Sequence, residues 1–133
     1  MSRVLGIDPG TACGWALFDD GKRYLSGSWD LSVKRHESEG MRFIRLEQQL
    51  NLMLTDKLAP VRMVAFEEVA RHAGTVAAHV YGGIIAIIKK VCTERGVAFS
   101  GIPVSTVKKL ATGKGNADKK AMMAAALVRW PEL

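Results

Sequence analysis

Residues 3–10 read RVLGIDPG, and this stretch decides the fold because an unbroken apolar run ends in Asp8 and meets a Pro-Gly turn. An apolar run bounded by turn residues is typical of a buried strand. Residues 14–18 and 24–31 are two further strand-like runs, and an Asp-Gly pair at 20–21 lies between them. That pair is a strong hairpin signal. The chain is therefore predicted to open with three antiparallel strands.

The remainder of the chain alternates helical and strand patterns. The predicted elements are, in order, a helix over 41–58, a strand over 61–66, a helix over 75–94, a strand over 97–102 and a helical region made of 105–110 and 117–129. Hairpin strands followed by crossover helices imply an α/β fold with a mixed sheet and helices on its faces. Gly82 and Gly83 lie inside the long helix, where glycine is unfavourable, so a close packing contact is expected there.

The composition favours an anionic partner. The 133 residues carry a net charge of +6 and a pI of about 9.6. Residues 103–133 hold six Lys and Arg against two acids, so most of the excess lies in the last quarter. Nucleic-acid-binding proteins show this imbalance, although a solvated helix face produces the same run of lysines.

Cysteine usage and hydropathy indicate a reducing cytoplasmic location without a membrane segment. Cys13 and Cys92 form no CxxC pair, which argues against a zinc site or a disulfide framework. No signal peptide opens the chain. The longest apolar run, around 84–88, is too short to span a bilayer.

Two acids stand out because each follows a predicted buried strand: Asp8 after the first and Glu67 after the fourth. Ligands gather at the carboxyl ends of strands in open α/β sheets. If these strands are neighbours, the two carboxylates face each other and suit Mg²⁺ or Mn²⁺. A simple turn-capping role for Asp8 stays open. Glu68 is expected on the opposite face, so Glu67 is the preferred ligand.

Several segments resemble the RuvC family of Holliday junction resolvases. The matching segments, in order, are LGIDPG at 5–10, GWA at 14–16, VAFEEV at 64–69, YGGII at 81–85, VKK at 107–109 and GKGNADK at 113–119. The resemblance covers nearly the whole chain, and the short length is more similar to phage or prophage members than to the cellular enzyme.

This resemblance implies a ribonuclease-H-like fold that cuts branched DNA, such as four-way junctions, with two Mg²⁺ or Mn²⁺ ions. Asp8 and Glu67 would be the metal ligands and catalytic acids. Lys119 would be a catalytic lysine near the scissile phosphate, and Lys108 would bind the substrate beside it.

Lys114, in the basic glycine loop, and Arg71 are further expected substrate-binding residues. Arg71 lies where the family often has an aromatic residue that enters the junction, so an ordinary loop role for it stays open. The family also completes its site with a C-terminal acidic pair. Residues 1–133 are expected to form a single nuclease domain that lacks this acidic segment, and the native chain is expected to continue past Leu133.

Two other functions remain in view. One is a non-catalytic module that binds branched DNA, and the other is a nucleotide-binding domain of the actin and sugar-kinase type, whose phosphate loop the segment DPGT at 8–11 matches. A resolvase should be a homodimer because a four-way junction is two-fold symmetric, and the helix over 75–94 is the expected interface.

Overall fold

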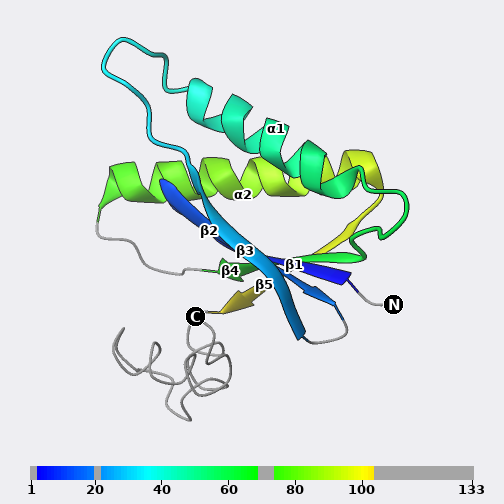
Figure 1. Cartoon of the computed structure of the whole chain (residues 1–133). Helices are drawn as coiled ribbons and strands as arrows, with labels where there is room; N and C mark the ends of the chain where they lie inside the picture. Colours follow the sequence, from blue (N-terminus) through cyan, green and yellow to red (C-terminus); the bar gives the residue numbers. More distant parts are fainter. Residues whose placement is uncertain (1–2, 20–21, 69–73, 104–133) are drawn as a thin grey trace. The chain divides into compact units, whose positions relative to one another are not determined.

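The computed structural model describes residues 3–19, 22–68 and 74–103. These residues fall into two compact units, one of 3–66 with 74–100 and one of 67–68 with 101–103. The predicted helical region over 105–110 and 117–129 lies outside the described residues. The elements that position the candidate site belong mainly to the first unit (Figure 1).

The chain opens with an antiparallel meander, as the sequence predicts. Strands β1 (Arg3–Asp8), β2 (Ala12–Asp19) and β3 (Lys22–Asp30) pair in sequence order. Both later strands are longer than expected, because polar residues at their ends still pair across the ladder. A register irregularity between Leu17 and Phe18 interrupts the pairing of β2 with β3.

Two further strands complete a five-stranded sheet of order β3-β2-β1-β4-β5. Strand β4 (Met63–Glu68) runs parallel to β1, and β5 (Ala98–Pro103) is the last strand along the chain. The mixed sheet confirms the predicted fold class. The strand predicted over 61–66 is displaced by two residues, since β4 begins at Met63 and includes both glutamates.

Helices α1 (Met41–Leu54) and α2 (Thr75–Arg95) lie together on one side of the sheet (Figure 1). Helix α1 ends four residues earlier than predicted. There the Asp56 carboxylate accepts the backbone N–H groups of Leu58 and Ala59, at 3.0 and 3.2 Å. Such local bonds compete with the helical ladder. Helix α2 ends at Gly96, whose φ of +68° is the left-handed conformation that glycine adopts readily.

The predicted close contact in α2 involves Gly83 alone. A Cβ atom added at Gly83 would lie 2.4 Å from Cζ of Phe43 on α1, whereas one at Gly82 would have nothing within 4 Å. Gly83 therefore lets the two helices approach each other, and Gly82 does not serve that purpose.

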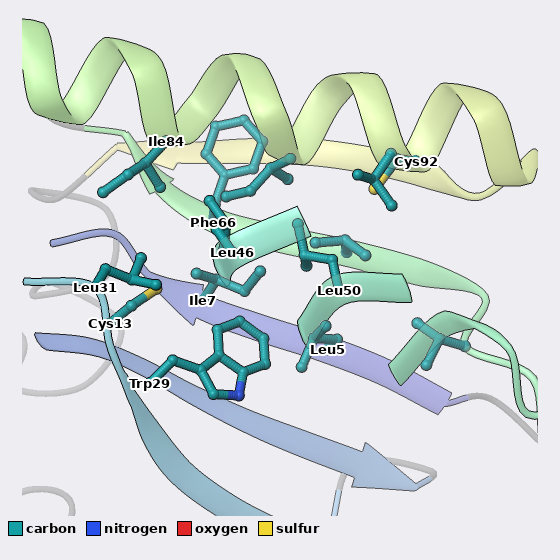
Figure 2. Close-up of a cluster of buried hydrophobic side chains, with 14 of the residues drawn as sticks. Leu5, Ile7, Cys13, Trp29, Leu31, Leu46, Leu50, Phe66, Ile84 and Cys92 are labelled. Atoms are coloured by element: carbon teal, nitrogen blue, oxygen red, sulfur yellow. The ribbon is translucent and has the colours of Figure 1, made fainter. Parts of the chain in front are cut away.

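The hydrophobic core lies between the helices and one face of the sheet (Figure 2). The fully buried side chains are Leu5, Cys13, Leu31, Leu46, Leu50, Val64, Ile84, Ile88, Val91 and Cys92. Trp15 and Trp29 stack nearby with ring centroids 5.7 Å apart. Cys13 and Cys92 are buried free thiols.

Helix α2 is long and apolar enough to cross a membrane by length and composition alone, although its longest unbroken apolar run is short. Core helices pass the same test, and the buried Ile84, Ile88, Val91 and Cys92 assign α2 to the core.

Candidate metal centre

The carboxyl end of β1 presents an acid on the sheet face opposite the core. Leu5 and Ile7 are buried under the helices, and strand alternation places Gly6 and Asp8 on the other face. Asp8 is exposed. Its carboxylate makes no hydrogen bond or ion pair to another residue in the part of the chain that the structure describes. It is therefore available to an external cation.

The neighbouring strand leaves space beside Asp8. The register of β1 and β2 places Gly14 directly opposite Asp8. A Cβ atom at Gly14 would lie 3.7 Å from Cβ of Asp8, in ordinary van der Waals contact. Because glycine has no side chain, nothing from this position of β2 covers the acid.

Strand β4 ends in two acids, Glu67 and Glu68. In the parallel register, Ile7 of β1 pairs with Phe66 of β4, and the next residues along the two strands are Asp8 and Glu67. Val64 and Phe66 are buried, so alternation assigns Glu67 to the face opposite the core and Glu68 to the core-side face. Glu67 is half-buried and Glu68 exposed. This alternation agrees with the choice of Glu67, which stays a prediction.

The donor chemistry at these strand ends fits a hard divalent cation. Carboxylate oxygens are the ligands that Mg²⁺ and Mn²⁺ prefer. Among residues 3–19, 22–68 and 74–103, however, no group of three or more His, Cys, Asp or Glu side chains is gathered as a metal site. The described residues thus supply oxygen donors for part of a site.

Cys13 lies beside Asp8 but is no candidate ligand. Burial raises the pKa of its thiol to about 11; a backbone hydrogen bond at Gly10 lowers it, and the negative charge of Asp8 raises it. The fully buried thiol belongs to the hydrophobic core, whereas Asp8 is exposed, so the thiol does not face a cation bound at Asp8. The candidate donors at these strand ends, among the described residues, are therefore carboxylate oxygens.

The other predicted site residues, Arg71, Lys108, Lys114 and Lys119, lie outside the described residues. Their roles stay predictions.

Sequence reasoning missed one basic feature near β1. No function was assigned to residues 32–40 from the sequence. Lys34, Arg35 and His36 are consecutive and all exposed. Leu31, just before them, donates its backbone N–H to the carbonyl of Thr11 at 2.7 Å. The run of three basic residues at 34–36 was the feature of the sequence that could have indicated this basic surface.

Comparison with curated proteins identifies clear relatives. The crossover junction endodeoxyribonuclease RuvC of Mycobacterium ulcerans is 32% identical over 130 residues, which cover 92% of this chain and 67% of that protein. The protein of the same name from Corynebacterium efficiens is 30% identical over 124 residues, or 90% of this chain and 55% of that protein. No family model matches the chain.

Solved structures show the same fold. RuvC of Thermus thermophilus in complex with a Holliday junction substrate has a TM-score of 0.79 at 22% identity, over 96% of this chain and 79% of that one. A second T. thermophilus RuvC structure has a TM-score of 0.74 at 23% identity, over 95% and 78%. These matches support the ribonuclease-H-like architecture expected from the sequence.

Proposed function

Because the chain belongs to the RuvC family of crossover junction endodeoxyribonucleases, we propose that it cuts Holliday junctions or other branched DNA by metal-dependent hydrolysis of a phosphodiester bond. The observation that carries the proposal is the strand-end pair. Neighbouring parallel strands place Ile7 opposite Phe66, and an acid follows each of them. Ligands bind at such carboxyl ends in open α/β sheets.

In this proposal Asp8 and Glu67 are the protein ligands and catalytic acids. Their carboxylates would hold Mg²⁺ or Mn²⁺, and the absence of a side chain at Gly14 leaves room for a phosphate next to Asp8. Two bound ions would supply an activated water and stabilise the leaving oxygen of an in-line displacement.

The basic residues of the resemblance would act on the DNA itself. Lys119 would neutralise charge at the scissile phosphate, with Lys108 beside it. Lys114 and Arg71 would hold the flanking backbone. Lysine and arginine contacts to phosphate position DNA and supply salt-dependent affinity without reading its sequence.

Cleavage of synthetic DNA tests this function. The chain is incubated with a four-way junction and with linear duplex, in Mg²⁺ or Mn²⁺ and in EDTA. Junction cleavage that needs a divalent ion is the expected result. Junction binding without cleavage in any metal would instead support the non-catalytic module, and ATP binding without DNA affinity would support the nucleotide-binding alternative.

A matched pair of variants tests the ligand assignment. Glu67→Gln should abolish cleavage because it removes an ion ligand, whereas Glu68→Gln should leave it nearly unchanged because alternation assigns Glu68 to the other face. Equal loss in both variants would refute the choice of Glu67.

We also propose a homodimer with α2 at its interface, acting in the cytoplasm. A two-fold symmetric junction is cut symmetrically by two copies of one site. Val76 on α2 is a large apolar side chain that is 77% exposed, so a substitution there tests α2 as the interface. Light scattering should show a dimer that Val76→Glu dissociates. Leu58→Glu, at a 98% exposed loop position, is the control. A monomer at micromolar concentration would refute the dimer.

A further inference from the structure

A basic turn connects β3 to α1. Lys34, Arg35 and His36 are exposed and consecutive, and we call these three residues the basic turn. The backbone N–H of Glu37 donates to the carbonyl of Lys34 at 2.9 Å and closes the turn. Within the described part of the chain, the side chains of Arg35 and His36 make no hydrogen bond or ion pair. The Arg35 guanidinium and the His36 imidazole therefore face solvent.

Glu37 directly follows the basic turn, and its carboxylate is already engaged within the protein. The Glu37 carboxylate accepts the backbone N–H of Lys34 at 2.7 Å and forms a salt bridge with Arg45 of α1. The Arg45 hydrogen bond, followed by that backbone bond, lowers the pKa of Glu37, so it remains an anion engaged within the protein. It is not available to neutralise an external ligand or to compete with one.

Helix α1 fixes the loop before the basic turn. Arg42 donates from Nε to the carbonyl of Leu31 at 2.9 Å, and Arg45 donates from Nη1 to the carbonyl of Ser32 at 3.0 Å. A loop that is ordered before binding loses less conformational entropy when a partner binds. The basic side chains thus extend from a preorganised support.

The basic turn lies at the same end of the sheet as Asp8. Strands β1 and β3 both run antiparallel to β2, so their carboxyl ends share one edge (Figure 1). The bond from Leu31 N–H to the Thr11 carbonyl, 2.7 Å long, joins the loop after β3 to the loop after Asp8. A polyanion bound at Asp8 would therefore extend past this edge.

We propose that the basic turn binds the phosphate backbone of a DNA arm that extends from the cleavage site. The inference rests on the proposed nuclease function and names a second contact surface for the same substrate. Exposed lysine and arginine release condensed counterions when they contact DNA phosphates. Such contacts hold an arm in register without reading its sequence.

A charge-matched pair of double variants tests the proposal. Lys34→Gln with Arg35→Gln removes two charges from the basic turn. Lys57→Gln with Arg62→Gln removes two exposed charges from the loop before β4, at the opposite end of the sheet. All four side chains are exposed, so both variants should keep the unfolding midpoint of the unaltered chain. The dissociation constant for a four-way junction is measured in EDTA, across a series of salt concentrations.

We expect only the basic-turn variant to lose affinity for the four-way junction. Each phosphate contact contributes about 0.9 to the slope of log Kd against log salt, so the first variant should lower that slope by about 1.8. At 0.1 M salt this corresponds to a loss on the order of tenfold per contact. The second variant should leave the slope unchanged, and cleavage at saturating DNA should be retained in both.

Two failures can be told apart. The unaltered chain could bind and cut the junction while both double variants keep its slope of log Kd against log salt. In that case the basic turn is a solvated surface, and only this inference is refuted. If the unaltered chain binds no branched DNA, the proposed function fails and the inference falls with it.

Discussion

Replacing Gly83 with alanine tests how closely α1 and α2 pack. The added Cβ would lie 2.4 Å from Cζ and 2.5 Å from Cε1 of Phe43. The ring would have to move by about 1 Å to restore an ordinary contact, and overpacking of this kind typically costs about 1–3 kcal/mol. Against this, replacing a glycine with alanine inside a helix stabilises it by about 0.5–1 kcal/mol.

Gly82 is the natural control because it occupies the same helix and has nothing within 4 Å of an added Cβ. The gain in helix propensity is common to both variants and cancels in their comparison. Gly82→Ala should therefore raise the free energy of unfolding, and Gly83→Ala should lie about 1–3 kcal/mol below it. For a chain of this length that is roughly 4 °C in Tm per kcal/mol.

Urea denaturation measures both free energies, at one protein concentration, because association would add to apparent stability. A double variant completes the test: Phe43→Leu should make Gly83→Ala as favourable as Gly82→Ala, since the obstructing ring is gone. If Gly83→Ala alone is already as stabilising as Gly82→Ala, Phe43 does not pack on Gly83 and the reasoning is refuted.

Three further predictions concern the acids and the end of α2. Asp8→Asn should lower the cleavage rate at least about a hundredfold, because the loss of a residue that only supports a metal ligand already costs about 10–100-fold. Junction binding in EDTA should persist. Cleavage assays and gel shifts measure the two effects. The Arg3 hydrogen bond lowers the pKa of Asp19, so its contribution is full above the unfolded pKa near 3.8 and is lost as the pH falls through the lowered value. Asp19→Asn should therefore destabilise the chain at neutral pH, and in acid unfolding the difference should disappear as the pH falls through the lowered pKa of Asp19. Gly96→Ala should cost about 1 kcal/mol in chemical denaturation because its φ is +68°, and Gly96→Asn should recover much of the loss.

Hydrophobic patterning predicted the fold class because its signals are local. The runs at 3–8 and 61–66 are apolar on both faces and were identified as buried strands. That β1 and β4 are neighbours, with Ile7 opposite Phe66, is a tertiary fact that no local pattern contains. The sequence supported only a conditional prediction: if the two strands are neighbours, the carboxylates of Asp8 and Glu67 face each other.

Boundaries were missed where backbone pairing continues beneath polar side chains. Glu67 and Glu68 belong to β4, although the apolar pattern stops at Phe66. Helix α1 was extended to residue 58, because Leu58 fits the helical spacing while Asp56 forms a local turn there. Patterns of hydrophobicity do not register either kind of backbone bond.

The sequence predicted which residues form the candidate site but not how those residues are arranged in space. An acid after a buried strand, with a resemblance to a nuclease family, was enough to name Asp8 and Glu67. The space beside Asp8 depends on the register with Gly14, and the fixed basic turn depends on contacts from α1. Both need the folded chain.

The two buried thiols can also be used to follow local opening of the fold. Burial holds the pKa of Cys13 and of Cys92 at about 11, so at pH 8 roughly one thiol in a thousand is ionised while the chain is folded. Cys13 lies on β2 beside the candidate centre, and Cys92 lies on α2. Alkylation of each would therefore proceed through transient exposure. Labelling rates measured for each cysteine by mass spectrometry would separate local opening near β2 from release of α2, without an added probe.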